Sequence, residues 1–333
     1  MSPVIDVHAH VLVPEVERLV RDEPFLAAAR EEGAAGQTQQ TRDINAALMA
    51  DQWGRELVDL DTRLAAMDAM GVDVQVLSIS PYQYHYGAPL AVAAELVELA
   101  NERLSALASG HPDRFRAMAT VALQYPELAA EQLVRSHAAH GTKAVMISSW
   151  AGGRDLGDPA YEPFWSAAEQ TGALVFIHPI GSSLGARLRE HYLSNIVGNP
   201  TETTLALSHL IFGGVLDRHP GLTVLAAHGG GYLPYYIGRS DHGYAVRPES
   251  RGPAHPPSHY LTRLYFDTIV HSAQILEQLV AVAGADRVLL GTDYPYDMGT
   301  RDPLALLAAA RLSDDDRAAI AGGNAARLLG GQP

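Results

Sequence analysis

Five residues with side chains suited to metal chemistry follow short apolar runs of the sequence. His8 and His10 follow the first run, and His178, His228 and Asp293 follow three later ones. Imidazole nitrogens and carboxylate oxygens are the usual ligands of zinc and manganese in proteins. Residues two apart in an extended strand share a face, so His8 and His10 are predicted to point together. The chain has no cysteine, which excludes thiolate ligands and disulfides.

The elements that must position these residues alternate along the chain in the rhythm of βα units. Eight strands are expected, near Val4–Val7, Val72–Ser78, Arg116–Val121, Lys143–Ser148, Leu174–His178, Leu222–Ala227, Leu264–Thr268 and Arg287–Gly291. Helices are expected over Thr62–Met70, Leu90–Leu107, Leu128–Ala139, Tyr161–Gln170, Thr201–Leu216 and Ala273–Ala283, with a capping box of Ser313 and Asp316 opening a final helix. The pattern predicts an α/β fold, a (β/α)8 TIM barrel of one domain over residues 1–333. Such a barrel brings all strand ends to one rim, where its catalytic residues lie.

The stretch of residues 14–60 is too long for an ordinary βα loop. We expect an insertion or small subdomain after the first strand, lying over the mouth of the barrel. The small, polar stretch Gly33–Gln40 leaves a partly disordered loop as the alternative. The segment Ser182–Pro200, after the fifth strand, is expected to be a loop that covers the site from the other side.

Composition and charge limit the classes of partner that the protein is expected to bind. The formal net charge is −14, which argues against nucleic acid and anionic membranes as partners. No apolar run approaches the length of about 18 residues that a membrane helix needs. The first residues lack the basic and apolar regions of a signal peptide. A cytoplasmic protein with a small-molecule substrate is therefore expected.

Several separated motifs, in order along the chain, resemble those of one enzyme family: Ile5-Asp6-Val7-His8-Ala9-His10, His178-Pro179, His228-Gly229-Gly230-Gly231 and Gly291-Thr292-Asp293-Tyr294-Pro295. They are similar to the amidohydrolase superfamily and, more narrowly, to its aminocarboxymuconate-semialdehyde decarboxylase-like branch. The resemblance extends from Val4 to the closing Gly323-Asn324-Ala325. It implies that His8, His10, His178 and Asp293 bind one divalent metal. It also implies that His228 is an acid–base residue that does not bind the metal.

The only lysine of the chain bears on the number of metal ions. Binuclear members of the superfamily bridge two metals with a modified lysine at the end of the fourth strand. Here that strand ends in Ser148 and Ser149, and Lys143 is expected at its opposite end. The resemblance therefore implies a site for a single metal ion. Zinc is the expected metal, with manganese as the alternative, because nitrogen and oxygen ligands suit either.

Two reactions fit this set of residues. The first is non-oxidative decarboxylation of a small unsaturated or aromatic carboxylic acid, with metal-bound water and His228 in acid–base roles and Asp293 relaying the proton or orienting through its free oxygen. The alternative is a hydrolase or hydratase that acts on a lactone, an amide or an unsaturated acid at the same mononuclear site. The ligand set does not distinguish them, because the orientation of the substrate decides which atom is attacked.

Substrate contacts are expected from three residues. Arg239 aligns with an arginine that, in the semialdehyde decarboxylase, reaches the substrate carboxylate across a dimer interface, so a homodimer is expected; the alternative is a surface ion pair with Asp241. Tyr82 and Tyr84 are expected to stack on an aromatic substrate or to form hydrogen bonds with it; the alternative is that they pack their loop onto the barrel. A second arginine of the family is replaced by Asp51, which puts the semialdehyde itself in doubt as the substrate.

Overall fold

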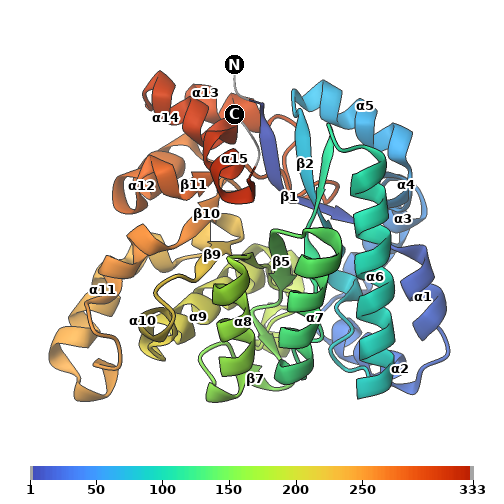
Figure 1. The fold of residues 1–333 in the computed structure, drawn as a ribbon, viewed down its shortest axis with the longest axis horizontal. Coiled ribbons are helices and arrows are strands. Elements are labelled where there is room, and N and C mark those ends of the chain that lie inside the picture. Colours follow the sequence, from blue (N-terminus) through green and yellow to red (C-terminus); the bar gives the residue numbers. More distant parts are fainter. Residues whose placement is uncertain (1–2, 331–333) are drawn as a thin grey trace.

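Eight short parallel strands form a barrel in the computed structural model, which describes residues 3–330 (Figure 1). In order around the barrel these are β1 (Ile5–Val11), β2 (Val74–Ile79), β3 and β4 together (Phe115–Ala117 and Ala119–Thr120), β5 (Ala144–Ile147), β8 (Leu174–Ile177), β9 (Thr223–Ala226), β10 (Tyr265–Asp267) and β11 (Val288–Leu289). Backbone hydrogen bonds from Val7 to Leu290 and from His10 to Tyr294 join β1 to β11 and close the ring. The predicted (β/α)8 barrel is confirmed.

Apolar side chains on both faces explain why these strands lie in the interior. In β8, Val175 and Ile177 pack in the cluster that contains much of the outer helical layer. Leu174 and Phe176 alternate with them and belong to a second apolar cluster, in which Phe176 lies 4.9 Å from the ring of His8. A strand that buries both faces reads as a continuous apolar run, which is the pattern seen in the sequence. Residue 178 therefore continues the inward-facing row.

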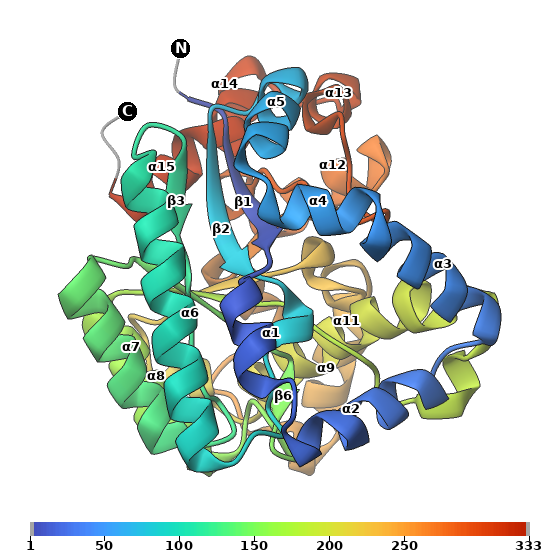
Figure 2. The same cartoon turned by 90° about the vertical axis from the view of Figure 1, so that its right-hand side faces the viewer.

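An outer layer of helices surrounds the barrel (Figures 1 and 2). Its members are α5 (Leu60–Met70), α6 (Leu90–Gly110), α7 (Pro126–His140), α8 (Glu162–Thr171), α9 (Asn199–Phe212), α10 (Val215–Arg218), α11 (Leu233–Val246), α12 (Ala273–Ala283), α13 (Pro303–Ala309), α14 (Asp314–Ala318) and α15 (Asn324–Leu329). The single helix predicted over Thr201–Leu216 is two helices, because the chain turns at Gly214 with a φ of +67°. The predicted cap is present: the Ser313 hydroxyl accepts the N–H of Asp316 at 3.1 Å.

The long segment after β1 is helical. It contains α1 (Pro14–Val20), α2 (Pro24–Ala35), α3 (Gln39–Ala50) and α4 (Gln52–Val58). Figure 2 shows α2, α3 and α4 following one another in an arc at the edge of the molecule. The Thr38 hydroxyl caps α3, and the Leu12 N–H donates to the carbonyl of Leu57, which ties the end of α4 to the end of β1. A disordered loop is therefore not the structure of this segment.

Short elements complete the chain. The expected loop after β8 contains three helical turns, η3 (Gly185–Leu188), η4 (Glu190–Tyr192) and η5 (Ser194–Gly198). A small antiparallel hairpin of β6 (Trp150–Ala151) and β7 (Arg154–Asp155) follows β5. The remaining turns are η1 (Pro81–Gln83), η2 (Pro159–Tyr161), η6 (His228–Gly230), η7 (Pro248–Ser250), η8 (Pro257–Arg263), η9 (Ala285–Arg287) and η10 (Ala319–Gly323).

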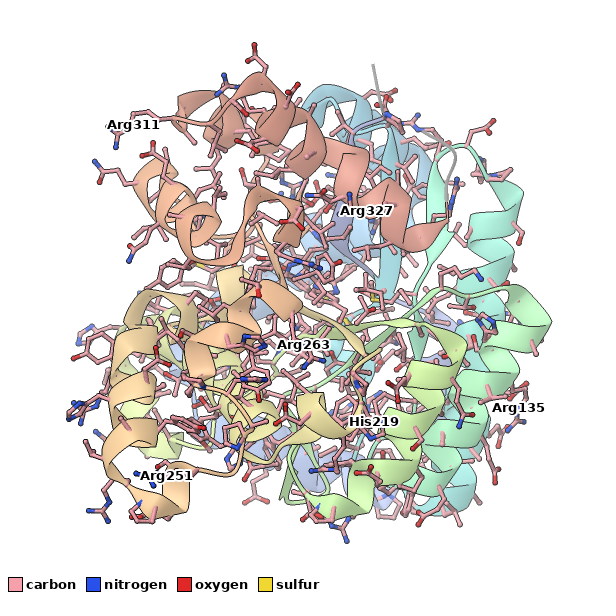
Figure 3. The ribbon with its side chains drawn as sticks, turned by 60° about the vertical axis from the view of Figure 1, so that its left-hand side comes forward. Arg135, His219, Arg251, Arg263, Arg311 and Arg327 are labelled. Carbon is pink, nitrogen blue, oxygen red and sulfur yellow. The ribbon has the colours of Figure 1, made fainter. Side chains whose placement is uncertain are left out.

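Many cations of the outer layer are paired locally. Arg135 of α7 lies 3.2 Å from Glu98, and Arg311 lies 2.8 Å from Glu277. Figure 3 shows both arginines at the edge of the molecule, on different elements. Among residues 3–330, no helix is long and apolar enough to cross a membrane.

Candidate metal centre

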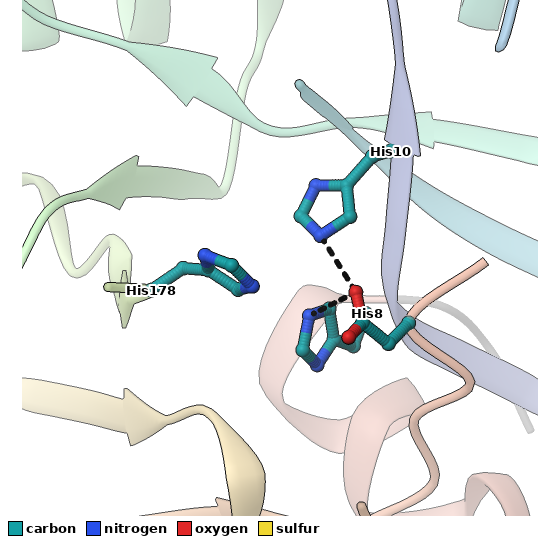
Figure 4. A group of neighbouring side chains, drawn as sticks. His8, His10 and His178 are labelled. Atoms are coloured by element: carbon teal, nitrogen blue, oxygen red, sulfur yellow. Dashed lines mark ion pairs between the residues drawn. The ribbon is translucent and has the colours of Figure 1, made fainter. Parts of the chain in front are cut away.

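Four buried side chains converge at the carboxyl-terminal rim of the barrel. One donor atom from each of His8, His10, His178 and Asp293 lies within 4.8 Å of the others. The Nε2 atoms of His8 and His10 are each 3.2 Å from the same carboxylate oxygen of Asp293. Figure 4 shows these two contacts as dashed lines, with the ring of His178 reaching toward them from another strand. The structure thus brings together the four residues predicted as ligands.

Strand β1 carries two of these side chains, His8 and His10, and sets the direction of their rings. It is longer than predicted and runs to Val11, so both histidines lie within it rather than beyond its end. Its register against β2 shifts between Asp6 and Ala9, where three residue steps on β1 oppose two on β2. This extra residue is a β-bulge, which bends a strand and redirects its side chains. His8 lies within the bulge and His10 just beyond it, and their ring centroids are 5.1 Å apart.

Asp293 and His228 occupy strained backbone positions. Both have a φ of 55°, in the left-handed region that side chains other than glycine seldom adopt. Such strain costs about 1–3 kcal/mol and is concentrated at functional sites. His228 lies at the end of β9, with its Nε2 3.7 Å from Asp293 Oδ2. It is therefore beside the donor group without being one of the four converging residues.

Asp267, at the end of β10, holds two parts of the site together. One of its oxygens lies 2.6 Å from His8 Nδ1 and also accepts the backbone N–H of His228 at 3.0 Å. The other oxygen accepts the N–H of Gly229 at 2.8 Å. A carboxylate on the far nitrogen of a metal-binding imidazole fixes which nitrogen faces the metal. Asp267 therefore leaves the Nε2 atom of His8 to face the donor group.

Sequence reasoning missed Asp267, although its signal was present. It is the next-to-last residue of the seventh predicted strand, Leu264–Thr268, close to the strand-end positions that identified His178 and Asp293. The corresponding partner of His10 is Ser78, whose hydroxyl lies 3.0 Å from the Nδ1 of that ring. Ser78 is the last residue of the predicted strand Val72–Ser78, but serine is not a residue type that binds zinc or manganese, so its position carried no comparable signal.

The electrostatics of the group favour a cation. Burial lowers the pKa of His10 to about 4 and, helped by the neighbouring histidines, holds that of His178 well below its usual range. Burial opposes ionisation of Asp293, but the surrounding imidazoles keep its pKa well below the ordinary value. At His8, burial is outweighed by Asp293 and Asp267, which raise its pKa. His10 and His178 are therefore neutral and Asp293 is ionised, the forms in which these groups bind metals, whereas His8 must release a proton when a metal binds.

The unpaired atoms of the group make a direct test of the fit. His8 Nε2, His10 Nε2, both ring nitrogens of His178 and Asp293 Oδ1 are buried and have no hydrogen-bond partner among residues 3–330. Buried polar atoms without a partner are rare and costly in native proteins. One divalent cation would satisfy all four side chains at once. Lys143 precedes β5, opposite to the rim, so the described residues offer no bridging lysine for a second ion.

Aromatic side chains form a wall beside His10. The ring of Tyr296 lies 5.5 Å from His10, 5.2 Å from Trp53 of α4 and 6.1 Å from Tyr82. Trp53 and Tyr82 also line a cavity of about 280 Å³, whose other walls come from α3 and the residues before it. Tyr84 is placed differently: it is buried, stacks on Tyr86 and donates its hydroxyl to the carbonyl of His178 at 3.0 Å. The sequence did not identify Tyr296 or Trp53.

Arg239 lies on α11 and is exposed to solvent. Its predicted alternative partner, Asp241, accepts the N–H of Ser258. Among residues 3–330 the structure shows no ion pair for Arg239.

The family model for amidohydrolases matches residues 5–331. The chain is 35% identical to a 2-amino-3-carboxymuconate-6-semialdehyde decarboxylase of Dictyostelium discoideum, over 83% of this chain and 77% of that one. It is 29% identical to a gamma-resorcylate decarboxylase of Rhodococcus jostii (strain RHA1), over 84% and 90% of the two chains. A 5-carboxyvanillate decarboxylase from Sphingomonas paucimobilis shares the fold with a TM-score of 0.85, at 25% identity and full coverage of both chains.

The chain therefore belongs to the amidohydrolase family, as its motifs predicted. Relatives matched over most of their length are named as decarboxylases, and this chain has a buried histidine and aspartate group that could hold a metal ion.

Proposed function

We propose that this enzyme decarboxylates a small unsaturated or aromatic carboxylic acid without an oxidant, using one divalent metal held by His8, His10, His178 and Asp293. The observation that carries the proposal is the convergence of four buried donor side chains whose facing atoms have no other partner. When bound, the metal would supply a Lewis acid that polarises oxygen atoms of the substrate. The names of the relatives support the reaction.

His228 is assigned the proton transfer. It lies beside the metal ligands, within 3.7 Å of Asp293 Oδ2, and its Nδ1 has no partner among the described residues. The protonated ring gives its proton to the substrate carbon that bears the carboxylate. The bond between that carbon and the carboxylate then breaks, its electron pair restores the double bond, and CO2 leaves. Asp293 orients the imidazole toward the reacting carbon through its second oxygen, which lies 3.7 Å from His228 Nε2.

The aromatic wall selects for a flat substrate. Tyr296 and Trp53 meet edge to face beside His10, and Tyr82 extends the wall toward the cavity. Aromatic side chains bind a planar ring through stacked or edge contacts. We therefore propose that Tyr82 contacts the substrate. We propose that Tyr84 acts through its bond to the carbonyl of His178 and has, at most, an indirect effect on substrate affinity.

A homodimer would give Arg239 a role. The same helix α11 and the residue before it expose Tyr232 and Tyr236, with 45% and 68% of their surfaces accessible. Tyrosine and arginine are enriched where protein interfaces form. We propose that a second copy packs on this face and receives the guanidinium of Arg239 at its substrate carboxylate. Mixing Arg239→Ala subunits with His228→Ala subunits tests it, because a shared site would restore part of the activity.

The reaction is tested with the enzyme loaded with zinc or manganese. Zinc is the proposed metal, and a 5-carboxyvanillate decarboxylase of Novosphingobium aromaticivorans, with a TM-score of 0.83, contains manganese. Each form is incubated with hydroxybenzoates, muconates and lactones, and CO2 and substrate absorbance are followed separately. Release of CO2 with equal loss of substrate is expected. Loss of a lactone or muconate without CO2 would replace the decarboxylase by the hydrolase or hydratase.

A further inference from the structure

Arg63 of α5 is a buried arginine in an unusual position. Only 2% of its surface is exposed, and no carboxylate among residues 3–330 lies within ion-pair distance of it. A buried charge is costly unless hydrogen bonds satisfy it. Its guanidinium donates to the carbonyl of His10 at 2.5 Å, the carbonyl of Glu56 at 3.1 Å and Gln75 Oε1 at 3.0 Å. The first of these partners is the backbone of a metal ligand.

A second path leads from Arg63 to the other ligands on this side. Gln75, which accepts a hydrogen bond from Arg63, in turn donates one to Asp6 Oδ2 at 3.0 Å. The carboxylate of Asp6 accepts the N–H groups of His8 and Thr292, both at 3.0 Å, and the Thr292 hydroxyl at 2.6 Å. Thr292 immediately precedes Asp293. The network therefore touches the backbone at or beside three of the four ligands.

The other end of the network is helix α4. Besides its carbonyl bond to Arg63, Glu56 pairs through its carboxylate with Arg301 at 2.7 Å. The guanidinium groups of Arg63 and Arg301 both lie over the ring of Tyr294, at 4.8 and 4.5 Å from its centroid. Cations over an aromatic face are attracted to it. Tyr294 follows Asp293, so α4 is joined to the loop that carries this ligand.

Helix α4 also carries Trp53, which lines the cavity and packs against Tyr296. Both the wall of the cavity and the anchor of Arg63 thus belong to one short helix. We propose that Arg63 is a positioning residue that couples the placement of α4 to the metal ligands. The inference rests on the proposed metal site. Because coupling between two sites is reciprocal, whatever fixes α4 against the site strengthens metal binding, and the bound metal fixes α4.

The test measures Mn²⁺ affinity by titration calorimetry on the apo-enzyme without substrate. Arg63→Met keeps the apolar stem and removes the donors, and Mn²⁺ affinity should fall by about 10-fold, the lower end of the effect of outer partners of metal ligands. Arg55→Met is the matched control, because Arg55 is an exposed arginine on α4. The Arg55→Met protein should bind Mn²⁺ as tightly as the parent. Trp53→Leu should weaken Mn²⁺ binding in the parent chain but have little further effect in Arg63→Met.

Three results would overturn the coupling. One is unchanged Mn²⁺ affinity in a folded Arg63→Met protein, even with a lower melting temperature, since that describes a purely structural residue. Another is strict additivity of Trp53→Leu and Arg63→Met. If Arg63→Met does not fold, Gln75→Met replaces it, because this variant removes only the hydrogen bonds that lead from Arg63 to Asp6. The third contradicting result is then a Gln75→Met protein that binds Mn²⁺ as tightly as the parent. If the parent binds neither Mn²⁺ nor Zn²⁺, the proposed function itself is wrong. If the parent binds metal and releases CO2, a contradicting result from the variants overturns only the coupling through Arg63.

Discussion

The two sides of the metal centre are built differently. On the side of β1 and β11, His8 and His10 each have a second partner for the outer ring nitrogen, Asp267 and Ser78, and Asp293 donates its N–H to the carbonyl of His8. On the side of β8 and β9, neither ring nitrogen of His178 has a partner among residues 3–330. The same holds for Nδ1 of His228.

This difference separates two tasks. Rings held by outer partners keep one tautomer and one orientation, so the β1 side presents a fixed pair of nitrogens and a carboxylate to an incoming ion. A ring without such partners has no hydrogen bond that selects its tautomer or its orientation. His178 can therefore complete the ligand set after the ion has bound, and His228 can follow the proton during the reaction. A site built in this way combines a fixed metal-binding half with an adjustable half.

The largest expected effect is loss of a ring on the fixed side. His10→Ala should weaken metal binding by more than about 100-fold, beyond the loss that an outer partner causes. Activity should disappear in parallel, and added metal should restore only part of it. Metal content after dialysis and activity against metal concentration measure both, with the exposed His140→Ala as the control. Retention of stoichiometric metal by His10→Ala would show that this side does not recruit the ion.

The next effect concerns the adjustable side. His228→Ala should keep its metal but lose about 100- to 10,000-fold in kcat, the usual contribution of a general acid or base. His271→Ala is a matched control, because His271 is an exposed histidine with a similar left-handed φ of 52°. Measurements of kcat and of metal content together distinguish an acid–base role of His228 from a role as metal ligand. Loss of metal from His228→Ala would make this residue a ligand.

A smaller effect should follow from loosening the fixed side without removing a ligand. Asp267→Asn keeps the shape but replaces one acceptor oxygen by a donor, which disfavours the present orientation of His8. Metal affinity should fall by about 10- to 100-fold. In the Co²⁺-substituted protein the visible spectrum should also change, since it reports ligand geometry. Asp315→Asn, on the exposed face of α14, serves as the control; identical spectra and affinities in both variants would remove Asp267 from the site.

The smallest effect is expected at the carbonyl of His178. Tyr84→Phe removes the hydroxyl that donates to it and should lower the free energy of unfolding by about 1 kcal/mol, typical of one buried hydrogen bond. Tyr82→Phe removes a hydroxyl that has no hydrogen bond to any of residues 3–330 and should leave stability unchanged. Urea denaturation compares the pair. Equal stability of the two variants would mean that Tyr84 does not anchor this strand end.

The sequence predicted those parts of the fold and site that depend on local pattern. Runs such as Leu174–Ile177 are apolar on every residue, so they could be identified as buried strands, and α12 was predicted with its observed bounds. Residues such as His178 and Asp293 could be found because each follows such a run. Barrel geometry then brought them together.

The rest depends on contacts between distant segments. The bulge in β1 is a matter of register against β2, which the pattern of a single strand does not contain. Trp53 and Tyr296 form one wall although they belong to α4 and to the loop after β11. The helices of residues 14–58 were expected only as an insertion, because the small, polar residues around Gly33 obscure the helical periodicity. Their place over the mouth of the barrel stays a prediction.

The closure of the barrel has a consequence for the newly made chain. The hydrogen bonds from Val7 to Leu290 and from His10 to Tyr294 join the first strand to the last, and Asp293 lies in this seam. A chain leaving the ribosome exposes His8 and His10 with the first strand, but their carboxylate partner emerges only after all the other barrel strands. Full affinity for the ion therefore arises when the amino- and carboxyl-terminal strands dock, so a truncated product lacks a complete site.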